Sequence, residues 1–242
     1  MSVSDFTTPG NAPRTPQPLP SPERGLALWW CGLVRDASDL PAMWAALSPE
    51  EVARAERFGT DALRHRYVAG RWALRWTLAQ RLGVEPAAVP IRRGARGRPM
   101  LDEGRAPDFN VTHTLGVALI AHLDRPGWRV GVDIEGVDRT LSHDGLARKF
   151  LTDRERAAIA VRDDDGRRRA FLRLWTCKEA MSKATGDALS APFRKLDVAV
   201  APIPALAAGP APYTPGQWRL LPVDVPGGYF TTVAVWHEPH SP

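Results

Sequence analysis

The order of the expected secondary-structure elements constrains this fold most, because a similar order runs twice along the chain. The first half reads as a strand, two helices and short strands, near residues 26–34, 49–58, 62–82 and up to 117–122. The second half reads as a strand at 129–135, helices near 142–149, 153–160 and 167–183, and strands near 196–201, 217–223 and 229–236. This grouping predicts an α+β fold, a pseudo-twofold pair of similar α/β subdomains.

Proline-rich stretches mark the expected boundaries. Residues 1–24 carry six prolines and little that could be buried, which predicts a mostly disordered lead-in. Residues 202–215 read as a surface loop, because strand-like segments resume directly afterwards. We therefore expect a lead-in at 1–24, an N-terminal subdomain at 25–125 and a C-terminal subdomain at 126–240.

Composition narrows the function. No apolar run is long enough to cross a bilayer and no signal-peptide core follows the start, so we expect a cytoplasmic protein without a membrane partner. The net charge of +5 invites a nucleic-acid interpretation. Basic and acidic residues are interleaved, however, without the aromatic clusters of single-strand binders, so we expect no nucleic-acid partner. The two cysteines form neither a disulfide framework nor a metal cluster.

The strand at 129–135 carries two acids. The strand period of two places Asp133 and Glu135 on the same face. Two carboxylates on one face favour a bound cation, although an acidic pair facing solvent is the alternative.

The helical pattern at 167–183 carries another acid on its apolar side. Glu179 falls between Trp175 and Leu172, and a carboxylate there is costly unless it is paired or ligates a metal. The alternative is a surface pair between Glu179 and Lys183, worth about 0.3–0.5 kcal/mol. Only four of the 32 basic residues are lysines and two of them lie in this helix, which suggests a specific task for lysine.

Four motifs together resemble the signature of the 4′-phosphopantetheinyl transferases, in particular their larger, monomeric type. Gly131-Val-Asp-Ile-Glu135 precedes Trp175-Thr-Cys-Lys-Glu-Ala-Met-Ser-Lys183, and Glu135 and Glu179 are 179 − 135 = 44 positions apart. Upstream, Gly97-Arg98-Pro99 and Phe109-Asn-Val-Thr112-His113-Thr114 are similar to a Gly-Lys-Pro turn and a Phe-Asn-x-Ser-His-Ser segment. Arg98 and Thr112 replace the commoner lysine and serine.

The resemblance implies an activity. Such an enzyme transfers the 4′-phosphopantetheine arm of coenzyme A to a serine of an apo acyl or peptidyl carrier protein and releases 3′,5′-ADP. It also implies coenzyme A in the cleft between the two subdomains, and Mg²⁺, with Mn²⁺ as the alternative, held by Asp133, Glu135 and Glu179. Ile134 supplies no ligand, so a water would fill that position.

The resemblance also implies roles for single residues. Glu179 or a metal-bound water would take the serine proton, with Lys183 as the second choice. Lys183, His113 and Arg98 would offset the charge of the phosphates. The residues expected to bind coenzyme A are Arg54, Arg93, Gly97, Arg98, Pro99, Thr112, His113 and Lys183.

Several alternatives stay open. His113 could be a satisfied histidine at a strand end, and the arginines could be solvated; Arg64, Arg71 and Arg75 read as arginines that snorkel from a core face. Other function classes are a metal-dependent nucleotide-diphosphate hydrolase and a non-catalytic protein that binds carriers or coenzyme A. Residues 141–165 are the expected carrier-recognition segment.

Overall fold

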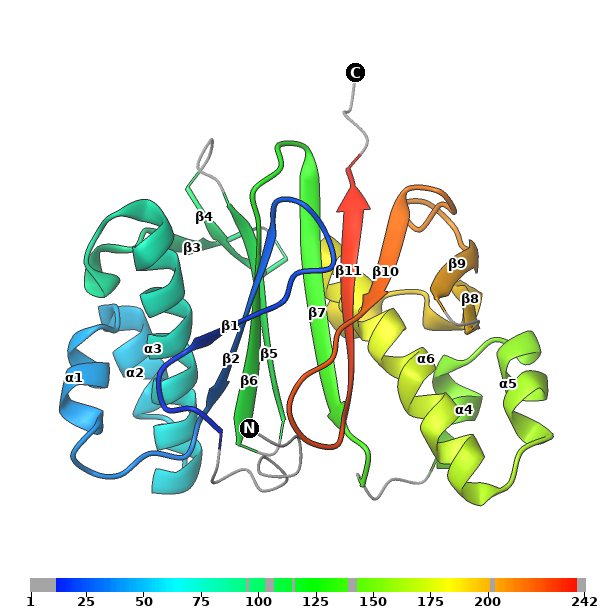
Figure 1. The fold of residues 1–242 in the computed structure, drawn as a ribbon, viewed down its shortest axis with the longest axis horizontal. Coiled ribbons are helices and arrows are strands. Elements are labelled where there is room, and N and C mark those ends of the chain that lie inside the picture. The colour runs from blue at the N-terminus through cyan, green and yellow to red at the C-terminus, as the bar shows by residue number, and fades with distance from the viewer. Residues whose placement is uncertain are drawn as a thin grey trace.

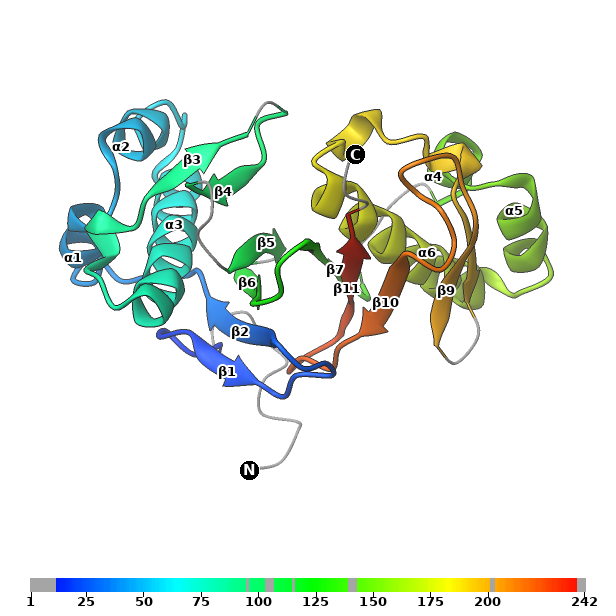
Figure 2. The ribbon, with the colours of Figure 1, turned by 90° about the horizontal axis from the view of Figure 1, so that it is seen from above.

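Two groups of helices flank two antiparallel sheets in the computed structural model (Figure 1). The structure describes residues 12–94, 96–102, 107–114, 116–138, 143–200 and 203–238. Helices α1–α3 lie at one end of the molecule and α4–α6 at the other, with the strands of the two larger sheets between them (Figure 2). The expected α+β class is confirmed.

The first sheet has the order β1-β2-β6-β5. Its strands are β1 (Gln17–Leu19), β2 (Leu26–Gly32), β6 (Val117–Leu123) and β5 (Asp108–Thr114). Its helices are α1 (Leu40–Ala45), α2 (Pro49–Ala55) and α3 (Asp61–Leu82). A capping box of Ser48 and Glu51 starts α2, and Gly83 ends α3 with a φ of 67° that suits glycine. Leu74 and Leu78 of α3 pack on Phe109 and Ile120 of the sheet.

The second sheet has the order β10-β11-β7. Its strands are β10 (Trp218–Pro222), β11 (Tyr229–His237) and β7 (Trp128–Gly136). The helices of this half are α4 (His143–Phe150), α5 (Asp153–Ala160) and α6 (Asp164–Thr185). Asp163 caps the start of α6 and Gly186 ends it with a φ of 83°. Phe171 and Met181 of α6 pack in one core with Phe230 of β11.

Two small hairpins complete the fold. One joins β3 (Ile91–Arg93) to β4 (Pro99–Leu101), and the other joins β8 (Asp197–Val200) to β9 (Pro204–Ala208). Gly97, in the turn of the first hairpin, has a φ of 77°, which explains glycine in the Gly-Arg-Pro motif.

Side chains of β5 join the two sheets. Asp108 Oδ2 accepts the Val130 N–H of β7 at 2.8 Å, and Asn110 Oδ1 accepts the Val132 N–H at 3.1 Å. The two side-chain oxygens accept from the backbone N–H groups of β7 in place of a neighbouring strand's carbonyls, because β5 and β7 belong to different sheets. The junction therefore places the phenylalanine–asparagine segment of β5 beside the acidic strand β7.

Two expectations about the proline-rich stretches were wrong. Part of the lead-in, Gln17–Leu19, forms β1 and pairs with β2, whereas residues 1–11 lie outside the described residues. Part of the expected loop, Pro204–Ala208, forms β9 and pairs with β8. Proline is compatible with the edge of a sheet, where its missing N–H leaves no ladder bond unmade. Among the described helices, none combines the length and apolar character that spanning a membrane requires.

Candidate functional site

Close packing between β7 and α6 assembles the site. A Cβ atom built on Gly131 would lie 1.9 Å from the carbonyl oxygen of Ala180, so only glycine allows this approach. The first glycine of the acidic motif therefore has a physical reason. It lets the acidic strand lie directly against the helix that carries Glu179 and Lys183.

A cavity of about 430 Å³ opens at this contact, and we call it the carboxylate cavity. It is lined by residues of β5, β7 and α6: Val111, Thr112, His113, Thr114, Asp133, Ile134, Glu135 and Lys183. Lys183 Nζ lies 2.6 Å from Asp133 Oδ1, 3.0 Å from Thr112 Oγ1 and 3.2 Å from the Val132 carbonyl oxygen. The Thr112 hydroxyl donates to Asp133 Oδ1 at 3.3 Å. The structure thus brings together Thr112, His113, Asp133, Glu135 and Lys183, as the sequence predicted.

Asp133 is the residue that most favours a bound cation. Asp133 is 4% exposed, and no described residue donates a hydrogen bond to its buried Oδ2 atom. Burial raises the pKa of Asp133, and the ammonium of Lys183 offsets only part of that rise. A buried carboxylate oxygen that lacks a donor is stabilised by a hard cation such as Mg²⁺.

The three expected metal ligands do not form a ready-made site. Within the described ranges, no three His, Cys, Asp or Glu side chains are grouped to share one ion. Instead, Asp133 pairs with Lys183 and Glu135 accepts a hydrogen bond from Trp175 Nε1 at 3.1 Å. Magnesium sites commonly use one or two carboxylates together with substrate phosphates, so Asp133 and Glu135 fit this ion. Glu179 stays a predicted ligand.

Ile134 and His113 have distinct surroundings. The Ile134 side chain packs in the apolar cluster with Val132 and Val233, and as expected it has no atom that could ligate a cation. Burial and the charge of Lys183 lower the pKa of His113. The imidazole is therefore neutral at pH 7 and can donate one hydrogen bond to a phosphate.

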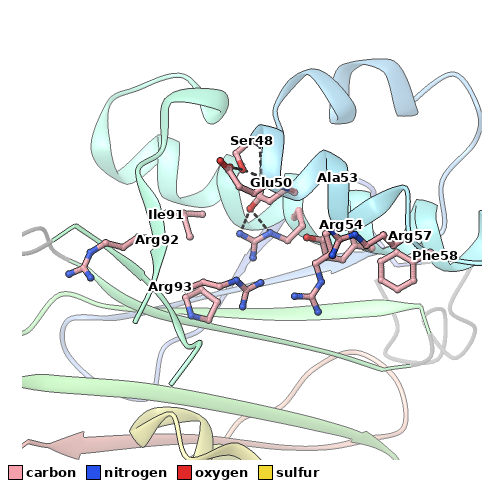
Figure 3. A pocket seen from close by; sticks show the side chains of 13 residues that line it. Ser48, Glu50, Ala53, Arg54, Arg57, Phe58, Ile91, Arg92 and Arg93 are labelled. Atoms are coloured by element: carbon pink, nitrogen blue, oxygen red, sulfur yellow. Dashed lines mark hydrogen bonds and ion pairs between the residues drawn. The ribbon is translucent and has the colours of Figure 1, made fainter. Parts of the chain in front are cut away.

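A larger cavity of about 860 Å³, the arginine cavity, lies between α2, α3 and the β3–β4 hairpin. Arg54, Arg93 and Pro99 of the expected coenzyme A set line it. Figure 3 shows Arg54 and Arg93 reaching towards the same space from α2 and β3, while Arg92 points away from them. Residues that the sequence analysis had not assigned to a site also line it, namely Phe58, Tyr67, Arg57 and Arg92. Phe58 and Tyr67 are in ring contact, with centroids 5.2 Å apart.

Arg71 and Arg75 were expected to snorkel from a core face to solvent, and this expectation was wrong. Both pair with Glu51 of α2, and the side chain of Arg75 is only 2% exposed. Arg75 Nη1 also donates to the carbonyl oxygens of Pro86 and Val89 at 3.0 and 3.1 Å. Sequence reasoning missed this pairing, because Arg71 and Arg75 lie 20 and 24 positions from Glu51.

Arg98 also differs from the prediction. Its guanidinium donates to both Asp108 oxygens at 2.8 and 2.7 Å, and to the carbonyl oxygens of Phe109, Val130 and Lys183 at 3.1, 2.8 and 3.0 Å. Arg98 lines neither the arginine cavity nor the carboxylate cavity. Its N–H groups bind oxygen atoms of both halves of the molecule. We therefore assign Arg98 to the junction between the sheets and not to the phosphates of coenzyme A. Gly97 supplies the turn, and its carbonyl accepts from Arg93 Nη1 at 2.9 Å.

Lys178, the other lysine of the motif, has a structural task. Its side chain is fully buried, and Nζ lies 2.6 Å from Glu155 Oε2. Nζ also donates to the carbonyl oxygens of Phe150 and Phe193 at 3.0 and 2.9 Å. These bonds tie α6 to α4, α5 and the segment before β8.

Comparison with known proteins identifies the family. Residues 129–234, which include the acidic strand and α6, match the model of the 4′-phosphopantetheinyl transferase superfamily. The 4′-phosphopantetheinyl transferase HetI of Nostoc sp. is 35% identical over 212 residues, which is 86% of each chain. The chain belongs to the 4′-phosphopantetheinyl transferase superfamily. A 4′-phosphopantetheinyl transferase of Bacillus subtilis is 26% identical over 162 residues, covering 67% of this chain and 70% of that protein. A phosphopantetheinyl transferase of Thraustochytrium sp. is 32% identical over 160 residues, covering 59% and 53%.

Proposed function

We propose that this transferase moves the 4′-phosphopantetheine arm of coenzyme A to a serine of an apo acyl or peptidyl carrier protein, releasing 3′,5′-ADP. The observation that carries the proposal is the pair of buried Asp133 and partly buried Lys183 in the carboxylate cavity, where no described residue donates to Asp133 Oδ2. Family membership and the names of the relatives support the same reaction.

Coenzyme A would extend across both cavities. Arg54 and Arg93 would hold the 3′-phosphate in the arginine cavity, where the rings of Phe58 and Tyr67 offer apolar surface to the adenine. Lys183 and His113 would bind the diphosphate in the carboxylate cavity. The two cavities adjoin the same junction, because Pro99 lines the first and follows Arg98, which bonds the Lys183 carbonyl.

A divalent ion, Mg²⁺ or Mn²⁺, would be held by Asp133 and Glu135, with Glu179 as the proposed third ligand. When bound, it would neutralise diphosphate charge and polarise the phosphoryl group under attack. The ammonium of Lys183 lies 2.6 Å from Asp133 Oδ1 and would add a positive charge at the diphosphate under attack. Glu179 would accept the proton of the carrier serine as it attacks the β-phosphorus.

The finer architecture belongs to the same proposal. The helices α3 and α6, each of 22 residues, pack on separate sheets, which supports a pseudo-twofold pair of subdomains. The boundary near 125–126 falls between the end of β6 at Leu123 and the start of β7 at Trp128. We propose a monomer that acts in the cytoplasm.

Mass spectrometry of a carrier protein tests the proposal. Incubation of an apo carrier with coenzyme A, Mg²⁺ and the enzyme is expected to add one phosphopantetheine arm to the carrier serine. A panel of acyl, aryl and peptidyl carriers would identify the preferred class. Cleavage of coenzyme A without modification of any carrier would instead favour the nucleotide-diphosphate hydrolase.

Arg54→Ala is expected to raise the KM for coenzyme A about tenfold, with little change in kcat. A charge-assisted hydrogen bond to a phosphate contributes roughly 1.5–3 kcal/mol, and Arg54 is distant from the reacting phosphorus in this arrangement. Steady-state kinetics against coenzyme A concentration measure the effect. Arg81→Ala is the control, because Arg81 lies in the last turn of α3, pairs with Asp124 and is not among the residues that line the arginine cavity. Equal effects of the two substitutions would contradict a specific role for Arg54.

A further inference from the structure

Trp175 lies between an aromatic cluster and the acidic strand. Its ring is stacked on Phe171 at a centroid distance of 6.2 Å and an interplanar angle of 13°. Phe150 and Phe193 contact the same indole at 4.8 and 5.7 Å. Three neighbouring rings therefore fix the indole plane, and with it the direction of its one N–H group.

That N–H donates to a carboxylate of the carboxylate cavity. Trp175 Nε1 lies 3.1 Å from Glu135 Oε1, and Glu135 is buried on β7. A glutamate side chain has several rotatable bonds, so a carboxylate held by a rigid donor loses rotamers that it would otherwise sample. The indole is a donor only and carries no charge.

The two acids of the strand have different contacts in this cavity. Asp133 is paired with the ammonium of Lys183. Glu135 accepts a hydrogen bond from the uncharged indole of Trp175, so this bond orients the carboxylate without itself offsetting its negative charge. A cation that enters this cavity therefore meets a carboxylate that the indole has already oriented.

We propose that Trp175 is a positioning residue for the metal site. Its N–H fixes the carboxylate of Glu135 before the divalent cation binds, and so raises the affinity for that cation. The inference rests on the proposed metal assignment. Partners that orient metal ligands in this way typically contribute about 10–100-fold in metal affinity or activity.

Trp175→Phe tests the proposal, since phenylalanine preserves much of the aromatic packing and removes the donor. Binding of Mg²⁺ alone is measured by isothermal titration calorimetry, and binding of Mn²⁺ by electron paramagnetic resonance. We expect the dissociation constant for either ion to rise about 10–100-fold, at an unchanged far-ultraviolet circular dichroism spectrum. If this variant folds poorly, benzothienylalanine at position 175 keeps the bicyclic shape, lacks the N–H and should give the same rise.

Trp218→Phe is the matched control. Trp218 belongs to the same core, and its Nε1 donates to the Pro212 carbonyl at 3.1 Å, away from the acids. We expect Trp218→Phe to leave metal affinity unchanged. An equal fall in affinity in both variants would overturn the proposal, because it would show that disturbed packing is the cause.

Glu135→Gln separates the two possible failures. If Glu135→Gln weakens metal binding and the position-175 variants do not, the positioning role is wrong while the proposed metal site stands. If neither change affects binding, Glu135 is not a ligand and both ideas fail.

Discussion

Asp133→Asn is expected to lower phosphopantetheine transfer by about a thousandfold without lowering the stability of the fold. Charge stabilisation by a catalytic metal is worth several kcal/mol, and about 4 kcal/mol corresponds to that factor. Asparagine has the shape of aspartate, but it binds Mg²⁺ weakly and cannot pair with the ammonium of Lys183. Single-turnover measurements at saturating coenzyme A report the loss.

The expected stability follows from the buried charge. Burial raises the pKa of Asp133 above its ordinary value, so the folded state binds this proton more tightly than the unfolded state does. The stability of the fold therefore falls as the pH rises above the ordinary pKa of aspartate. At pH 7 the ionised carboxylate of Asp133 lowers the free energy of unfolding. Asparagine removes this cost. Lys183 keeps its bonds to Thr112 and Val132, and its side chain is 26% exposed.

Asp108→Asn is the matched control for this substitution. Asp108 is an acid of the neighbouring strand β5, but it bonds Arg98 and the Val130 N–H at the junction. Its replacement should lower the urea midpoint, with a much smaller effect on the transfer rate of the folded enzyme. A near-normal rate for Asp133→Asn would refute the metal assignment.

The sequence predicted the parts of the site that depend on local periodicity. The period of two placed Asp133 and Glu135 on one face, and the helical period placed Trp175 on the packed side of α6. The predicted positions of the two long helices also agree with α3 and α6, because both helices are long and have clear caps. These features are decided within one element, so neighbouring residues suffice to predict them.

Other parts depend on contacts between distant segments. Arg98 stands where a lysine is common, but its planar guanidinium can bind both oxygens of Asp108, and this uses its donors within the protein. The sequence marks Trp175 as a packed residue, while the partner of its N–H lies 40 positions away. The strands β1, β3 and β4 have three residues each, too few for a period of two to be recognised.

Glu51→Ala is expected to lower the free energy of unfolding by about 3–5 kcal/mol. Removing one partner of a buried ion pair leaves the other charge uncompensated, and here Arg75 is almost fully buried. Burial alone would raise the pKa of Glu51, but Arg71 and Arg75 more than offset this and lower it. The stabilisation is therefore present above the ordinary glutamate pKa and is lost as the pH falls through the lowered folded value. Urea unfolding at pH 7 and pH 4 measures both effects.

Glu50→Ala provides the comparison, because Glu50 is the exposed neighbour of Glu51 in the same turn of α2. Its loss should change stability by no more than about 0.5 kcal/mol. Glu51 and Arg71 both line the arginine cavity, so losing the acid leaves the cavity more positive and should not weaken coenzyme A binding to the folded protein. Weaker coenzyme A binding by Glu51→Ala at unchanged stability would contradict this assignment. It would mean that Glu51 contacts coenzyme A itself and does not support the arginines.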